Sequence, residues 1–168
     1  GLWAFPDVDP NAWYAVPSVD AWALGVVEGT DGKLNPERQL NIAEGVTMIS
    51  KAAGLEPDEN VTPEVKEMVG SIEWAGPYFQ AMANEVGFET LKEDIAGLGI
   101  GAQMQRDVFA DIAVQAYENV SGEEAPANSE AISNYTDYSK MNNDQKVDFA
   151  KAYELGIITG ANGGTLAN

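Results

Sequence analysis

Residues 23–29 read Ala23-Leu24-Gly25-Val26-Val27-Glu28-Gly29, and a similar phrase returns twice later in the chain. The later copies are Asn84-Glu85-Val86-Gly87-Phe88-Glu89 and Glu154-Leu155-Gly156-Ile157-Ile158-Thr159-Gly160. Each copy is typical of a helix that ends at a glycine and is followed by a short apolar step. The marker glycines are 62 and 69 residues apart (87 minus 25 and 156 minus 87). This spacing fits one helical hairpin plus a loop per unit. Such units must pack together to bury their apolar faces, so binding grooves are expected between them.

The composition excludes several classes of function. The chain has 168 residues, of which 9 are basic and 27 acidic, giving a net charge of −18. A field of this sign argues against nucleic acid or an anionic membrane as a partner. Cysteine and histidine are absent from the sequence, which excludes disulfides, thiolate zinc sites and Ser-His-Asp catalysis. No stretch approaches the roughly 20 apolar residues that span a bilayer. We therefore expect no metal, no cofactor and no membrane insertion.

Helix boundaries can be predicted from local signals. The first unit is expected to have a helix over 13–24 and a second helix that begins at Asn41 and stops at Gly54. An N-capping Asn three residues before Glu44 can satisfy exposed backbone donors reciprocally. The second unit is expected to be helical over 63–86 and again from about 105 to 118, with a loop containing Gly97, Gly99 and Gly101 between them.

The third unit is expected to be incomplete. A polar linker over 121–133 leads to a helix over 143–155, which opens with an Asn142-x-x-Gln145 capping box and ends at Gly156. Only eight residues follow Gly160, so the second helix of this unit is missing. Without that helix the unit would expose an apolar slot. A longer parent chain, a second copy or another protein would fill this slot.

The first unit resembles a surface-layer homology (SLH) module, and the later units resemble it more loosely. The residues that carry the resemblance in the first unit are Phe5-Pro6-Asp7-Val8, Trp13, Ala21, Gly25-Val26-Val27-x-Gly29, Asp31-Gly32-Lys33-Leu34-Asn35-Pro36 and Leu40-Asn41-Ile42-Ala43-Glu44. In the second unit they are Trp74-Ala75, Tyr78, Gly87 and Met104-Gln105-Arg106-Asp107. In the third they are Tyr135-x-Asp137, Ala152, Gly156-Ile157-Ile158-x-Gly160 and Gly164.

The resemblance implies both a fold and a function. The fold would be mostly α, a pseudo-threefold spindle of helical hairpins around a shared three-helix core, with long glycine-rich loops. Its units would be residues 1–56, 57–122 and 123–168. The function would be non-enzymatic anchoring of a surface protein, at the cell wall or in an S-layer, to a secondary cell-wall polysaccharide that is often pyruvylated.

The resemblance also points to site residues. In the family the second helix of a unit opens with Thr-Arg-Ala-Glu, whose arginine faces the groove, and a guanidinium can pair a ketal carboxylate bidentately. Here Ile42 replaces that arginine in the first unit, whereas Arg106 keeps it in the second, where Gln105 and Val108 replace the Thr and the Glu. The candidate carbohydrate-binding residues are Arg106, Gln105, Asp107, Gly29, Gly160, Trp13, Trp74, Asn41 and Glu44.

Several alternatives stay open. Arg106 could be an exposed salt-bridge partner of Asp107, and Gly29 and Gly160 could only make turns. Trp13 and Trp74 could stack on sugars, but aromatic residues at helical spacing are more often core, which is the interpretation we favour. The whole chain could also be a degenerate module that binds another protein. An enzyme is the third alternative and would need two carboxylates that converge in a pocket.

Overall fold

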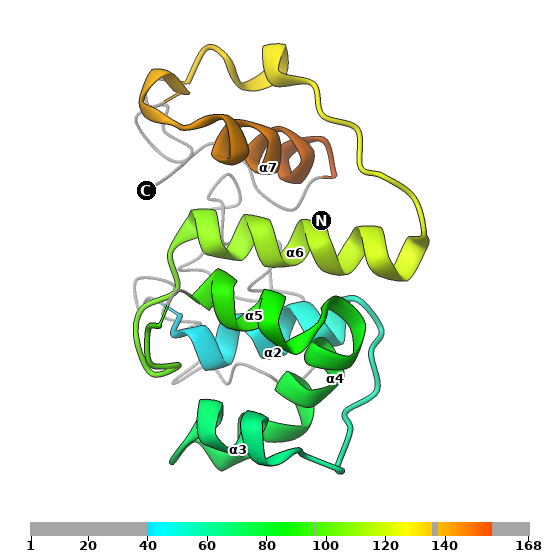
Figure 1. The fold of residues 1–168 in the computed structure, drawn as a ribbon. Coiled ribbons are helices and arrows are strands. Elements are labelled where there is room, and N and C mark those ends of the chain that lie inside the picture. Colours follow the sequence, from blue (N-terminus) through cyan, green and yellow to red (C-terminus); the bar gives the residue numbers. More distant parts are fainter. Residues whose placement is uncertain (1–39, 96, 136–137, 156–168) are drawn as a thin grey trace, which may run out of the picture.

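The computed structural model describes residues 40–95, 97–135 and 138–155, and these residues are mostly helical (Figure 1). The elements are α2 (Ile42–Ala52), α3 (Pro63–Val69), η1 (Glu73–Ala75), α4 (Gly76–Val86), α5 (Phe88–Ile95), α6 (Arg106–Ser121), η2 (Ser129–Ile132), η3 (Tyr138–Lys140) and α7 (Asn143–Glu154), where η denotes a 3-10 helix. In this part of the chain the only β pairing is an isolated antiparallel bridge between Asn41 and Gln103. The predicted mostly α fold is confirmed.

Helix α6 lies between two groups of helices. Figure 1 shows α7 on one side of α6, with α2, α4 and α5 on the other and α3 farthest away. Two apolar faces of α6 explain this position, because residues three or four apart share one side of a helix. One face holds Phe109, Ile112, Ala113 and Ala116, and the other holds Ala110 and Val114. The same helix therefore takes part in two cores.

The first core joins α2, α3, α4, α5 and α6. Its largest fully buried side chains are Ile42, Val46, Val65, Phe79, Met82, Leu91 and Ile112. Burying one such side chain contributes about 1.5–3 kcal/mol. These contributions hold the five helices together in one packed group.

The second core joins α7 and η2 to the opposite face of α6. Phe149, Ile132 and Val114 are buried here, from α7, η2 and α6 respectively. The rings of Tyr135 and Tyr153 pack edge to face at its margin, with 6.2 Å between their centroids. The segment after α6, predicted to be a polar linker, thus contributes Ile132 to a core.

Two helices begin with the capping boxes that the sequence predicts. Asn41 and Glu44 bond reciprocally at the start of α2, and Asn142 and Gln145 do so at the start of α7. Each box satisfies two backbone donors that the helix itself leaves open. The predicted starts of both helices are confirmed.

The prediction of one continuous helical segment over 63–86 is wrong. The chain leaves α3 at Gly70, whose φ of +54° is a conformation that glycine adopts most easily, and it restarts as η1 and α4. Helix α5 is not predicted either, because the repeated phrase places Phe88 in an apolar step after Gly87. Gly87 has a φ of +96° and separates α4 from α5 by a single residue.

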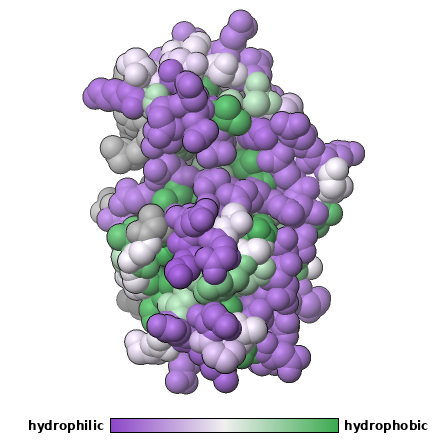
Figure 2. All heavy atoms as spheres, in the orientation of Figure 1, coloured by the Kyte–Doolittle hydropathy of each residue, from purple (hydrophilic) through white to green (hydrophobic). Residues whose placement is uncertain are grey.

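Some predictions lie outside the described residues. They concern the helix over 13–24, Trp13, Gly29, Gly160 and the end of the third unit. The unit limits 1–56, 57–122 and 123–168 and the threefold spindle stay predictions. Figure 2 shows that hydrophilic residues cover most of the face in view, as expected for a chain with a net charge of −18.

Candidate functional site

The starts of α2 and α6 are joined by backbone hydrogen bonds. The amide of Met104 donates to the carbonyl of Leu40 at 2.8 Å, and the amides of Ile42 and Ala43 donate to the carbonyls of Ala102 and Ile100, both at 2.9 Å. Residues 40–44 and 100–107 are called the α2–α6 seam below. In the predicted scheme this seam joins the second helix of unit one to the second helix of unit two.

The backbone donors at the start of α2 are used within the protein. The amide of Glu44 donates to Asn41 Oδ1 at 2.8 Å, and the amide of Asn41 donates to Glu44 Oε1 at 3.2 Å. The amides of Ile42 and Ala43 are occupied by the seam, and the Glu44 side chain is buried. Asn41 and Glu44 therefore fix the start of α2, and this helix start offers no open N–H groups to an anion.

The start of α6 is built differently. Gln105 occupies the N-cap position with an extended backbone, but its exposed side chain makes no capping hydrogen bond. Asp107 Oδ1 accepts from the amide of Val108 at 2.9 Å, and Asp107 Oδ2 accepts from Gln145 Nε2 at 3.4 Å. Since Gln145 belongs to the capping box of α7, the starts of α6 and α7 lie together. Figure 1 shows α2, α6 and α7 beginning on the same side of the molecule.

Arg106 lies inside the protein. It is only 4% exposed, so its interpretation as an exposed salt-bridge partner is wrong. Burying a guanidinium is costly because the group stays charged at every ordinary pH. Arg106, Gln105 and Asp107 are adjacent as predicted, but Gln105 is the only one of the three that is well exposed. A ligand contact through Arg106 would require its guanidinium to leave the buried position.

Trp74 is the largest exposed apolar side chain in the described residues. It lies on η1 and is 52% exposed, so the favoured interpretation of Trp74 as a core residue is wrong. Its neighbour Ala75 is buried in the first core and takes the place expected of an apolar residue in this turn. The segment also approaches the seam, since a Cβ built on Gly101 would lie 3.6 Å from Ile72 Cδ1. The indole is thus exposed and available for stacking, two residues after Ile72.

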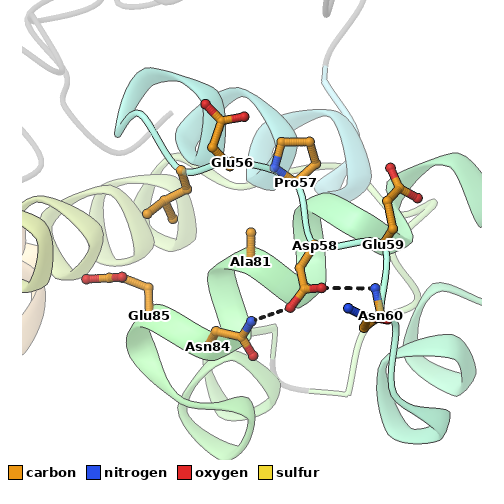
Figure 3. Close-up of a pocket in the computed structure, with 9 residues that line it drawn as sticks. Glu56, Pro57, Asp58, Glu59, Asn60, Ala81, Asn84 and Glu85 are labelled. Carbon is orange, nitrogen blue, oxygen red and sulfur yellow. Dashed lines mark hydrogen bonds between the residues drawn. The ribbon is translucent and has the colours of Figure 1, made fainter.

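A cleft of about 510 Å³ lies between α4 and the segment after α2 (Figure 3). Its lining residues are Leu55, Glu56, Pro57, Asp58, Glu59, Asn60, Ala81, Asn84 and Glu85. Asp58 organises the cleft, because Oδ1 accepts from the amide of Asn60 at 2.9 Å and Oδ2 accepts from Asn84 Nδ2 at 2.8 Å. The hydrogen bond from the Asn60 amide contributes most, and the bond from Asn84 contributes next, to holding the pKa of Asp58 below its ordinary value. The loop is thereby tied to α4.

The described residues form a helical protein in which backbone hydrogen bonds join the starts of α2 and α6. The family model of the S-layer homology domain matches residues 4–44, so this part of the chain is similar to such a domain. The match ends at Glu44, which closes the capping box of α2. Such domains generally mediate cell-wall anchoring, are not catalytic, and imply association with the cell surface or cell wall.

A search of curated proteins found none that matches the chain. Among the helices of the described residues, none is long and apolar enough to cross a membrane. The family assignment therefore depends on residues 4–44, and the described helices after Glu44 lie outside that match.

Proposed function

We propose that this chain anchors a surface protein non-covalently to the cell envelope by binding secondary cell-wall polysaccharide in the seams between its units. The observation that supports this most directly is the S-layer homology match over residues 4–44. The end of that match forms the α2 half of the α2–α6 seam. In this proposal the units are residues 1–56, 57–122 and 123–168, arranged as a pseudo-threefold spindle, and the anchored protein belongs to an S-layer.

Two exposed groups, Gln105 in the seam and Trp74 on η1, suit a sugar ligand. Gln105 presents an amide that can both donate and accept hydrogen bonds, and Trp74 presents an aromatic face. Asp107 can accept from sugar hydroxyls, while Arg106 acts from beneath as a buried positive charge. Gly29, Gly160 and Trp13 complete the proposed site. Micromolar affinity needs about 8 kcal/mol and one charge-assisted bond supplies about 1.5–3, so several contacts have to act together.

The second candidate function is protein interaction by a degenerate module. Two observations favour it: Ile42 replaces the arginine of the family in the first unit, and Arg106 is buried in the second. An apolar side chain and a buried guanidinium leave neither position open to an acidic substituent. A second copy of the chain or another protein would then occupy the seams.

Retention on purified wall polysaccharide tests the proposal, with and without its acidic substituents. We expect the parent chain to be retained, and Trp74→Ala and Gln105→Ala to weaken retention several-fold. Val147→Ala is the matched control, because Val147 is 44% exposed on α7, outside the seam. Thermal unfolding of each variant establishes that it is folded.

Comparing the polysaccharide with and without its acidic substituents tests the role of Arg106. If pyruvate or a similar group pairs with this guanidinium, removing that group from the polysaccharide should weaken binding of the parent chain. Binding of Arg106→Lys should weaken less, because lysine cannot pair bidentately. No retention of the folded parent on either form of the polysaccharide would contradict the proposal and favour the interaction module.

A further inference from the structure

Carboxylates from three different helices interact along α6. Asp94 comes from the end of α5, Asp111 from α6 and Asp148 from α7. Gln115, one turn after Asp111, joins two of them, because its Nε2 donates to Asp94 Oδ2 at 3.0 Å and to Asp111 Oδ1 at 2.7 Å. All four residues are half-buried. Asp94, Asp111, Asp148 and Gln115 are called the acid clasp below.

Negative charge predominates around the clasp. On α7, Asp144 adds to the field at Asp148, and on α6 Glu118 does the same. Lys151 opposes them from α7, but its ammonium is already bonded to Glu118. Asp94 and Asp111 accept from the same Gln115 amide, so they cannot both ionise without strong repulsion. Burial first, then the hydrogen bond and charge of Asp111, raise the pKa of Asp94 to about 7. Burial first, then the charges of Asp111 and Asp144, raise the pKa of Asp148 to about 6.

We propose that the acid clasp is a proton-operated switch that tightens the attachment of α5 and α7 to α6 when the surroundings become mildly acidic. A proton taken from solvent by Asp94 gives that carboxyl an O–H group, which can donate to the carboxylate of Asp111. One repulsive contact thereby becomes a charge-assisted hydrogen bond. Protonation of Asp148 removes its repulsion with Asp111 between α7 and α6. The clasp thus controls how firmly the second core is held to the first.

The sign of the effect follows from linkage. Both carboxyls hold their protons more tightly in the folded chain than in the unfolded chain, where the ordinary value is 3.8. Between about pH 4 and pH 7 the folded state therefore binds more protons, and stability rises as the pH falls through this window. This gain in stability is lost as the pH rises through about 6 and about 7, the pKa values of Asp148 and Asp94 in the folded chain.

Thermal unfolding of the whole chain as a function of pH tests the proposal. We expect the parent to gain about 3 °C or more in Tm between about pH 8 and pH 5. Asp94→Asn should raise Tm at the higher pH and remove a large share of the pH-dependent gain, and Asp148→Asn should remove a smaller share. Glu93→Gln is the matched control, since it deletes one exposed carboxylate from the same helix and reports the effect of net charge alone.

Two further measurements show which residues and which helix cause the pH-dependent gain in stability. The side-chain carboxyl of Asp94, followed by carbon NMR, should titrate more than two units above the ordinary value. Hydrogen exchange of α7 amides, corrected for the intrinsic rate, should slow on acidification more than exchange of α3 amides. An Asp94→Asn variant with the same pH dependence as Glu93→Gln, or an Asp94 carboxyl that titrates in the ordinary range, would overturn the proposal. Because these tests use no polysaccharide, their outcome is independent of the anchoring function.

Discussion

The ammonium of Lys151 lies 3.1 Å from both carboxylate oxygens of Glu118. Lys151 belongs to α7 and is only 8% exposed, whereas Glu118 belongs to the last turns of α6. Glu118 Oε2 also accepts from the amide of Ala125 at 3.2 Å, and Glu124 lies 3.5 Å from the ammonium. Burial alone would lower the pKa of Lys151, but the hydrogen bond and charge of Glu118, with those of Glu124, raise it above its ordinary value. This ion pair fastens the third predicted unit to the second.

Replacing Lys151 by methionine should destabilise the chain by about 2 kcal/mol. The substitution keeps the length and most of the apolar stem, but leaves the half-buried carboxylate of Glu118 without its cation. Urea unfolding measures the loss. Lys140→Met, at an exposed position on η3, is the control and should stay within about 0.5 kcal/mol of the parent.

A double-mutant cycle separates the pair from the packing of the lysine stem. Glu118→Gln alone should also be destabilising, and the combined variant should cost less than the sum of the two single changes. Strictly additive effects would show that the pair itself contributes nothing.

The capping box of α2 gives a second prediction. Asn41→Ala removes the acceptor for the amide of Glu44 and should cost about 1 kcal/mol of unfolding free energy. Asn41→Asp keeps an oxygen acceptor at the same place and adds a negative charge at a helix N-terminus, so it should lie within a few tenths of a kcal/mol of the parent. An alanine variant as stable as the aspartate variant would show that the seam alone fixes this helix start.

Gly45 and Met104 give a third prediction, because a Cβ built on Gly45 would lie 3.0 Å from Met104 Cε. Met104 is buried, and its Cγ and Sδ would also lie within 3.3 Å of that Cβ, so more than the flexible tip of the side chain would have to shift. Gly45→Ala should therefore destabilise the parent, although alanine favours a helix by about 1 kcal/mol. In a Met104→Ala background the same substitution should be stabilising, because the space is then free. The same sign in both backgrounds would contradict the close approach as the reason for glycine at this position.

The sequence predicted best where signals are local. Both Asn capping boxes lie within four residues, and the helices that they open were placed to within one or two residues. The sequence also carries a local signal for α5, since Phe88, Leu91 and Ile95 recur at helical spacing after Gly87. Glycine often ends a helix, but at a positive φ it can also join two helices with one residue, as Gly87 does here.

The orientation of side chains was harder to predict. Trp74 and Ala75 are neighbours on a single 3-10 turn, and the small residue is buried while the large one is exposed. Arg106 is buried although arginine is mostly found at the surface. Both outcomes depend on which elements pack around the residue, and helical periodicity cannot reveal those elements. The acid clasp likewise brings together residues 94, 111 and 148 from three helices.

Salt should speed binding to an anionic wall polymer if the proposed function is right. A chain with a net charge of −18 repels such a polymer at long range, and this repulsion is screened when the Debye length falls from about 10 Å at 0.1 M to about 3 Å at 1 M salt. Contacts inside the seam are screened less. The association rate, measured by surface binding, should therefore rise with salt while the dissociation rate changes little. A rate that falls with salt would indicate steering by a local positive patch instead.

Gly87 should resist substitution because it joins α4 to α5 at a φ of +96°. A Cβ there would meet Thr90 Oγ1 at an ordinary distance of 3.5 Å, so the penalty for alanine comes from the backbone and not from a clash. Gly87→Ala should cost about 1–2 kcal/mol of unfolding free energy. Gly99→Ala is the matched control, because Gly99 has open space around it and no positive φ, and there alanine should be neutral or slightly stabilising. Equal effects of the two substitutions in urea unfolding would mean that the joint between α4 and α5 relaxes at no cost, and that a left-handed glycine is not what separates these helices.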